Sequence, residues 1–408
     1  MSVAMQLPGI DLSNPGLFVD GWPHDAFAVL RAKAPVYWHE ERHGPGFWVV
    51  SKYHDVIAVQ LDSKTFSSAR GGTLMKEFND EERDAIRSQL INMDAPRHTR
   101  FRRLVNMGFS PKMTNRLTPH IREMATRIID TVAARGECDF VAQIAAELPL
   151  QVIAEMIGIP LEDRHLIFKW SNDMIGFDDP EYGGAGAEVG RAASMQMFMY
   201  ANELVERRKK TPRDDLVSVL MAAEVDGEKL TEVEFDSFFL LLAVAGNETT
   251  RNLISGGMLA LLQHPEQRAR LLADPSLMPT AVEEMLRWVS PVMYFRRTAT
   301  RAAELRGQQI REGDKLTVWY GSANRDEEIF PDAHRFDVGR TPNDHIAFGI
   351  GHHFCLGANL ARLEIQIMFE EIMRRLPDLE LAGSVERLRS NFIHGIKRMP
   401  VRFTPERS

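Results

Sequence analysis

A single cysteine stands in a glycine-rich turn directly before an amphipathic helix. Residues 348–357 read Phe-Gly-Ile-Gly-His-His-Phe-Cys-Leu-Gly, which places Cys355 after two glycines and two residues before Gly357. The glycines let the backbone fold tightly and lie close to a flat group. Gly357 removes a side chain where the following helix must approach that group. Apolar residues recur at helical spacing from Leu356 onward, so the helix N-terminus would favour the thiolate of Cys355. The turn predicts a metal bound through one axial sulfur; the alternative is an ordinary buried cysteine.

A second chemical feature is an acid with two hydroxyls inside an apolar segment. Residues 245–250 read Ala-Gly-Asn-Glu-Thr-Thr and follow the apolar run 238–244. Gly and Thr are poor helix formers, and a threonine hydroxyl can bond to the carbonyl four residues earlier. We therefore expect the motif to interrupt its helix and open a groove, where a hydroxyl above a metal could hold dioxygen. Alternatively, Glu248 pairs with Arg251 and Thr249 fills the core.

An acid and a base, Glu284 and Arg287, stand three residues apart, where their side chains can meet on one face of a helix. Most such pairs are solvated bridges that contribute less than about 1 kcal/mol. Here the flanking residues from Ala281 to Val289 are mostly apolar, which indicates a buried segment in which the two charges must satisfy each other.

The elements that must position these residues are mainly helical. Apolar periodicity predicts helices over 119–134, 195–209, 232–262, 279–289 and 356–376. Residues 36–39 and 46–51 are expected to form a hairpin, and 295–300, 308–310 and 315–320 another small sheet. Residues 321–348, rich in Pro, Asp, Asn and Gly, are expected to approach the cysteine turn irregularly. The fold class is therefore mainly α with small β-sheets.

Composition limits the class of protein. The 408 residues are 44% hydrophobic and 26% charged, which suffices for a sizeable core, and neither a linker nor a repeat divides them, so residues 1–408 are expected to form a single domain. A net charge of -8 argues against nucleic acid as a partner.

Cysteine content and hydropathy bear on location. Only Cys138 and Cys355 occur, too few for a disulfide framework, which fits a reducing cytoplasm. The longest apolar run, 238–245, is shorter than the roughly twenty residues that span a bilayer, and residues 1–16 lack the blocks of a secretion signal. We expect a cytoplasmic protein with no membrane anchor.

The cysteine turn resembles that of the cytochrome P-450 haem-thiolate monooxygenases, whose pattern is Phe-Gly-x-Gly-x-His-x-Cys-x-Gly. Every fixed position is matched. The resemblance extends from about Asp94 to Phe403 and implies a triangular helical prism around a buried haem b. It implies that Cys355 ligates the iron and that the thiolate promotes cleavage of the O–O bond. It also assigns the surrounding cofactor contacts to Phe348, Gly349, His353 and Gly357.

The remaining motifs take roles from the same resemblance. Glu248 and Thr249 match the acid and alcohol that deliver protons during activation of O2, with Ala245 and Gly246 beside the cofactor; the family often has Asp at the position of Glu248. His98, Arg102 and Arg297 match propionate-binding positions, although Arg296 could replace Arg297. Glu284 and Arg287 match a Glu-x-x-Arg motif that is joined by an arginine of the irregular segment, here Arg335, to support the cysteine turn.

The resemblance implies hydroxylation of a C–H bond in a hydrophobic small molecule of steroid, terpenoid or fatty-chain type. The expected pocket walls are 71–75, 174–177, 241–245, 292–295 and 392–393, and the glycine-rich 183–186 could belong to a lid or to an ordinary surface loop. Since the chain carries no dinucleotide fingerprint or cluster-type cysteines, electrons would come from a ferredoxin and its reductase, docking near Arg100, Arg103 and Arg362. Rival hypotheses are a peroxide-driven peroxygenase and a non-catalytic haem-binding sensor.

Overall fold

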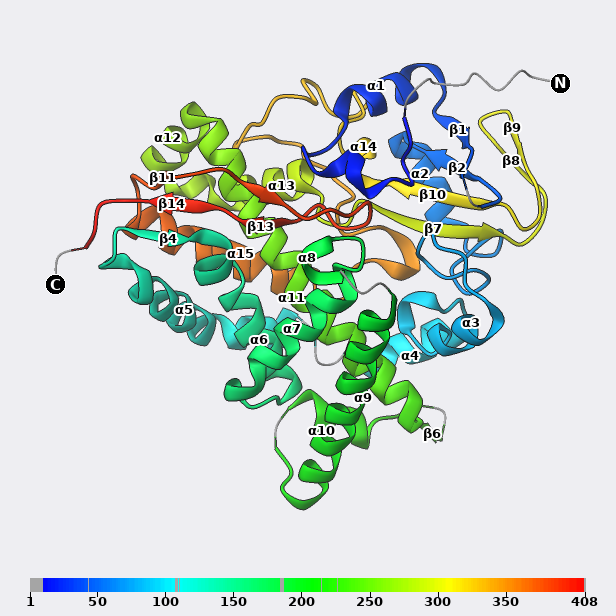
Figure 1. Ribbon diagram of the computed structural model, residues 1–408, viewed down its shortest axis with the longest axis horizontal. Coiled ribbons are helices and arrows are strands. Elements are labelled where there is room, and N and C mark those ends of the chain that lie inside the picture. Colours follow the sequence, from blue (N-terminus) through cyan, green and yellow to red (C-terminus); the bar gives the residue numbers. More distant parts are fainter. Residues whose placement is uncertain are drawn as a thin grey trace.

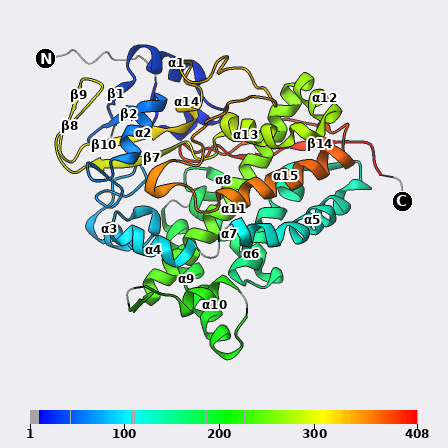
Figure 2. The same cartoon turned by 180° about the vertical axis from the view of Figure 1, so that it is seen from behind.

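The computed structural model describes residues 10–42, 44–106, 109, 111–183, 187–213, 215–225 and 227–406. Helices dominate it, and they surround the long helix α11 on several sides (Figures 1 and 2). Their bounds are α1 His24–Lys33, α2 Tyr53–Leu61, α3 Asp80–Ile86, α4 Arg97–Asn106, α5 Pro111–Ala133, α6 Glu147–Ile157, α7 Arg164–Ile175, α8 Pro180–Gly183, α9 Ala187–Lys210, α10 Leu216–Ala222, α11 Glu232–Gln263, α12 Pro265–Ala273, α13 Met278–Val289, α14 Tyr320–Ala323 and α15 Ala358–Arg375. All five predicted helices are confirmed, two of them with longer N-terminal ends.

The strands form one larger sheet and several short ribbons. The larger sheet has the order β1-β2-β10-β7-β3, with β1 Val36–His39, β2 Phe47–Val50, β10 Lys315–Trp319, β7 Tyr294–Ala299 and β3 Phe66–Ser67. The ribbons use β4 Glu137–Asp139, β5 Glu224–Val225, β6 Glu228–Lys229, β8 Ala303–Leu305, β9 Gln308–Ile310, β11 Glu380–Leu381, β12 Glu386–Arg387, β13 Ile396–Arg398 and β14 Pro400–Arg402.

The predicted hairpin is confirmed, but its separation from the second sheet is wrong. β10 pairs in parallel with β2 and antiparallel with β7, so the two predicted sheets are one. β9, expected beside β7 and β10, pairs with β8 instead. Parallel pairing between strands more than 250 residues apart depends on tertiary packing, which local alternation of apolar residues does not encode.

Helix α11 runs unbroken through the motif at 245–250, so the expected interruption is wrong. Its N-terminus is fixed by a capping box in which Thr231 and Glu234 satisfy each other's backbone amides. Thr249 does donate to the Ala245 carbonyl, at 2.8 Å, but the helix absorbs this bond without breaking. Packing against α6, α7, α9, α13 and α15 outweighs the poor helix propensities of Gly246 and the threonines.

The segment 321–348 is largely irregular, as predicted, and only the single turn of α14 enters it. It leads past buried Phe336 and Val338 to the cysteine turn, which a short 3₁₀ helix, Gly351–His353, closes before α15 begins. Among the described residues, no helix is both long and apolar enough to cross a lipid bilayer.

Candidate active site

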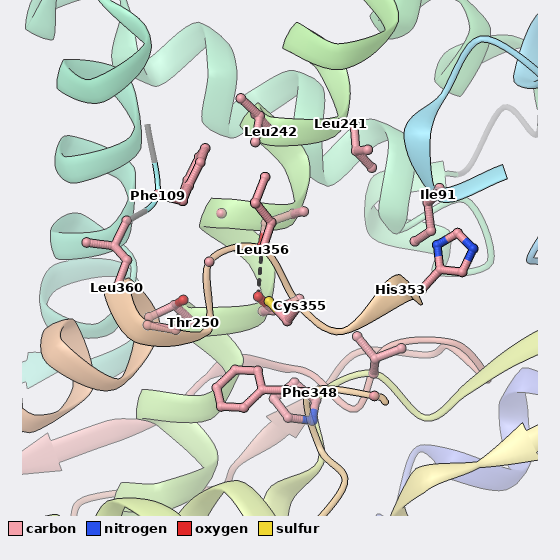
Figure 3. A pocket seen from close by; sticks show the side chains of 18 of the residues that line it. Ile91, Phe109, Leu241, Leu242, Thr250, Phe348, His353, Cys355, Leu356 and Leu360 are labelled. Atoms are coloured by element: carbon pink, nitrogen blue, oxygen red, sulfur yellow. Dashed lines mark hydrogen bonds between the residues drawn. The ribbon is translucent and has the colours of Figure 1, made fainter. Parts of the chain in front are cut away.

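A largely apolar cavity lies between α11, α13, β7, α15 and the cysteine turn, and it encloses about 1350 Å³ including its opening to solvent. Figure 3 shows Cys355 and Phe348 at this cavity together with Leu241, Leu242 and Ile91 from other parts of the chain. The cavity is thus built where the cysteine turn faces the α11 motif at 245–250.

The cysteine turn holds its sulfur by backbone geometry. Gly349 and Gly351 have φ of 69° and 73°, a left-handed conformation that favours glycine, so their role in folding the turn is confirmed. The Cys355 amide donates to the Phe348 carbonyl at 2.9 Å. Burial raises the pKa of the Cys355 thiol, while a hydrogen bond from the Gly357 amide and the charges of Arg102 and Arg362 act to lower it. The sulfur therefore has donors and cations around it that would stabilise a thiolate.

Two residues of the turn differ in their surroundings. A Cβ at Gly357 would meet no protein atom within 4 Å, and Gly357 lines the cavity, so a side chain here would occupy cavity space next to the cysteine turn. Phe348 packs beneath the Arg362 guanidinium, whose Cζ lies 4.6 Å from the ring centroid.

Three basic side chains, those of His98, Arg102 and His353, line one end of the cavity, and Arg297 of β7 lies near them outside the described lining. The rings of His98 and His353 lie 4.3 Å apart, and Arg102 and Arg297 are close enough to lower the pKa of both imidazoles. Burial is the larger cause, and it brings the pKa of His98 to about 4 and that of His353 to about 2. Both ring nitrogens of buried His98 lack a hydrogen-bond partner among the described residues. An acceptor placed here would satisfy several donors at once.

The adjacent arginines of β7 face opposite ways, as alternation along a strand requires. Arg296 forms an ion pair with Glu77 at 3.2 Å, whereas Arg297 donates to the Arg296 carbonyl at 2.8 Å and forms no ion pair within the described part of the chain. Burial lowers the pKa of both guanidinium groups. Since Arg296 is already paired, Arg297 is the arginine with capacity for a cavity anion.

The α11 motif divides its residues between two sides of the helix. Ala245, Gly246 and Thr249 line the cavity, while the Glu248 carboxylate is buried and bonded to Arg251, which in turn donates to Asn172 of α7 at 2.9 Å. Burial raises the pKa of Glu248 and Arg251 opposes that shift. The alternative of a Glu248–Arg251 pair is confirmed, and among the described residues Glu248 does not contribute to the cavity wall.

Gly246 also serves the packing of α11 on α6. A Cβ at this position would lie 2.9 Å from the Cδ1 atom of Ile153. A side chain here would therefore force the two helices apart.

The Glu284–Arg287 pair is fully buried and bidentate, with nitrogen–oxygen distances of 2.7 and 2.8 Å. The third member is Arg340, which donates to Glu284 at 3.1 Å, and not Arg335 as expected. The Arg335 side chain is 61% exposed, and only its backbone carbonyl joins the cluster, by accepting from Arg287 and Arg340. The irregular segment turns back between these two arginines, and sequence spacing alone could not show which one would point inward.

The walls of the cavity agree in part with the expectation. Leu241, Ala245, Val292 and Phe295 line it, but 71–75, 174–177 and 392–393 are not among its described lining residues. Leu242, within the predicted segment 241–245, lines it as well. Lining residues that the sequence reasoning missed include Leu90, Ile91, Phe109, Phe238 and Glu364. For Phe238 the signal was present, because it shares a helical face with Ala245 and Thr249.

Two of the three arginines expected to dock an electron donor are already paired. Arg100 forms an ion pair with Glu228, and Arg362 with Glu283 at 2.6 Å. Arg103 is exposed at the surface of α4. Of the glycine-rich stretch, Gly183 ends α8 and 184–186 lie outside the described residues.

Comparison with known proteins gives the family. A model described as cytochrome P450 matches residues 186–388. A steroid C26-monooxygenase of Mycobacterium tuberculosis is 42% identical over 97% of this chain and 93% of its own length. A methyl-branched lipid omega-hydroxylase of Mycobacterium bovis is 45% identical over 92% of this chain and 90% of its own. The chain therefore belongs to the cytochrome P450 family.

Solved structures agree with that assignment. A cytochrome P450 of Mycobacterium marinum in complex with pseudoionone has a TM-score of 0.87 and 39% identity, covering 93% of this chain and 94% of its own. One from Bacillus megaterium in complex with testosterone has a TM-score of 0.86 and 34% identity, covering 94% and 98%. The fold is that of the cytochromes P450.

Membership implies haem iron and the use of O2, and the residues of the cavity fit a haem. Its two propionates need cations or hydrogen-bond donors when buried, and this end of the cavity offers the unpartnered ring nitrogens of His98 with the cations of Arg102 and Arg297 near them. The open space beside Gly357 and the sulfur of Cys355 suit a flat ring with one axial thiolate.

Proposed function

We propose that this cytochrome P450 monooxygenase hydroxylates the alkyl chain of a steroid or a methyl-branched lipid, with haem b as its cofactor. The observation that carries the proposal is the placement of the Cys355 sulfur in a cavity whose remaining walls are mostly leucine, isoleucine, valine and phenylalanine. Such walls bind a hydrophobic molecule by shape, with few polar anchors.

The proposed roles of the chain's residues follow from their positions. Cys355 would hold the iron through its thiolate, and the Gly357 amide would stabilise that negative charge. His98, Arg102, Arg297 and His353 bind the propionates. Bound haem iron supplies the two-electron activation of O2, by which one oxygen atom enters a C–H bond and the other leaves as water.

The protein provides positioning and exclusion of water. Leu241, Leu242 and Phe295 hold the alkyl chain, so that one end is presented to the reacting centre. The Thr249 hydroxyl, which donates to the Ala245 carbonyl, can accept and pass on a proton at the cavity wall. Glu248 would connect this hydroxyl to solvent once its carboxylate leaves Arg251.

The substrate class is supported by the relatives' names and by the walls of the cavity. One relative is a steroid C26-monooxygenase and another a methyl-branched lipid omega-hydroxylase. Both names describe the end of an alkyl chain, which an apolar cavity accommodates without a buried polar partner. We therefore expect attack at or near a terminal methyl group.

External redox partners supply the electrons, and we propose a ferredoxin with its reductase, in the cytoplasm. Both Cys138 and Cys355 are free thiols, in keeping with a reducing compartment. Because Arg100 and Arg362 are each paired, the donor would have to compete with Glu228 and Glu283 for them.

The test begins with the haem-loaded protein reduced under carbon monoxide, whose absorption spectrum reports a thiolate ligand. Cys355→Ala should abolish that spectrum, while Cys138→Ala, the matched control, should preserve it. An unchanged axial ligand in Cys355→Ala contradicts the proposal.

Steroids with an intact side chain and methyl-branched fatty acids are then screened for the spin-state change of the ferric protein, and products are identified with ferredoxin and reductase present. Product formation from peroxide alone would favour a peroxygenase. Electron consumption without organic product from any compound of these classes would favour a sensor.

A further inference from the structure

Glu364 is a buried acid on the wall of the cavity with no assigned role. It lies in α15 with 3% exposure, and Oε2 of its carboxyl lacks a hydrogen-bond partner among the described residues. Leu360, one helical turn earlier, lines the same cavity, and Figure 3 places Leu360 on the same side as Thr250 of α11. An acid that costs free energy to bury persists only where something requires it.

The surroundings of Glu364 keep it neutral. Burial raises the pKa of Glu364 well above its ordinary value, with no charge nearby to oppose the shift. The helices packed on α15 are α5, α6, α11 and α13. Ion pairs on these helices and on α15 itself include Arg122–Glu370, Arg251–Glu248, Arg287–Glu284, Arg362–Glu283 and Arg374–Glu371, and none that the described residues form involves Glu364.

Glu248, the acid of the α11 motif, differs from Glu364 in both its partner and its position. The Glu248 carboxylate is bonded to Arg251 and lies outside the described lining, whereas Glu364 reaches the cavity without a basic partner. A carboxyl group bonded to arginine resists protonation, and a neutral carboxyl group holds a proton that it can give. Of the two acids, Glu364 is the one whose neutral carboxyl group can donate a proton directly into the cavity.

We propose that Glu364 is a second proton-donating residue of this monooxygenase, one that acts from α15 while Thr249 acts from α11. The inference rests on the proposed function. Hydroxylation combines R–H, O2, two electrons from the external donor and two protons to give R–OH and water. In the step assigned to Glu364, its O–H bond breaks, the proton goes to oxygen in the cavity, and the carboxylate regains a proton from water.

The test compares Glu364→Gln with two further variants. Glutamine keeps the shape of the side chain and removes the acidic proton, and Glu364→Asp retains an acid on a shorter arm. Glu371→Gln is the matched control, because Glu371 is also a buried glutamate of α15 but is bonded to Arg374 at 2.6 Å and lies outside the described cavity wall.

The first readout is independent of turnover. Infrared spectra of the haem-loaded protein at neutral pH should contain the carbonyl band of a protonated carboxylic acid, shifted in deuterated water. That band should vanish in Glu364→Gln and remain in Glu371→Gln. Its absence from the unmodified protein, or its persistence in Glu364→Gln, overturns the proposal.

The second readout is product formed per electron pair and its solvent isotope effect. We expect a rate of product formation about 100-fold lower in Glu364→Gln, the lower range for loss of a general acid, with electrons diverted to peroxide. Glu364→Asp should recover part of the rate, and Glu371→Gln should match the unmodified protein. Equal rates in Glu364→Gln and the unmodified protein refute the role.

The two failures are distinguishable. If the unmodified protein forms no product with any steroid or branched lipid, the proposed function fails, and the infrared band alone decides the protonation of Glu364. If the unmodified protein is active and Glu364→Gln equals it, the proposed function stands and the role of Glu364 is refuted.

Discussion

Replacing Arg340 by alanine should destabilise the protein far more than replacing Arg335. Arg340 donates to Glu284 at 3.1 Å and to the carbonyls of Pro331, Asp332 and Arg335 at 2.7, 3.1 and 2.8 Å. Breaking a buried ion pair completely costs about 3–5 kcal/mol. Glu284 would retain both bonds to Arg287, and water can reach the three carbonyls, so we expect a loss of about 2–3 kcal/mol.

The assay is urea unfolding followed by haem absorbance and circular dichroism at equal haem loading. Arg335→Ala is the matched control, and the exposed side chain predicts a change within about 0.5 kcal/mol. The cysteine turn should loosen in Arg340→Ala, so that part of the thiolate spectrum is lost at lower urea concentration than in the unmodified protein. The reasoning is refuted if the two variants shift the urea midpoint equally, or if Arg335→Ala shifts it more.

Further predictions concern α11, the basic end of the cavity and acid stability. Gly246→Ala should lower the free energy of unfolding by about 1–3 kcal/mol, because the new Cβ would press on Ile153. Adding Ile153→Val should restore part of the lost thermal stability, and no recovery in this double variant would contradict the contact. His98→Leu should raise the free energy of unfolding of the haem-free protein in urea by about 1 kcal/mol, since unpartnered ring nitrogens are removed. The same variant should transfer haem faster to an acceptor protein, and slower transfer would exclude His98 as a haem contact. Glu283 should stabilise the fold above its ordinary pKa of 4.5: burial raises that pKa, but bonds from His345 and Arg362 outweigh it and lower the folded value to about 2. This stability is lost as pH falls from 4.5 towards 2, so Glu283→Gln should flatten the acid limb of the unfolding curve, and an unchanged limb would contradict it.

Local patterns in the sequence predicted what depends on local geometry. The Glu284–Arg287 pair follows from helical spacing, and the turn at Gly349 and Gly351 follows from the conformational freedom of glycine. The boundaries of α11, α13 and α15 were predicted within two residues, whereas α5 and α9 each begin eight residues before the predicted start. The joining of β2 to β10 was not predicted, because strands distant in sequence select each other through side-chain packing.

The wrong predictions at the site concern the direction in which a side chain points, and not the type of residue. Arg335 and Arg340 are both arginines of one irregular segment, and only the fold of that segment turns Arg340 towards Glu284. Glu248 has the expected neighbours in sequence, yet its carboxylate points to Arg251 at the interface with α7. Spacing places a residue on an element, but rotation of that element against its neighbours decides what the side chain meets.

For Glu364, the direction of the side chain can be predicted from the sequence by asking which face of the helix it shares. Leu356, Leu360 and Ile367 mark the apolar stripe of α15, and Glu364 falls on that stripe and not opposite it. An acid on the apolar face of a helix must be paired or neutral when the helix packs. The residues three and four positions before Glu364 are Ala361 and Leu360, and those three and four positions after it are Ile367 and Met368. None of them is basic, so the sequence excludes an ion pair for Glu364 within its own helix.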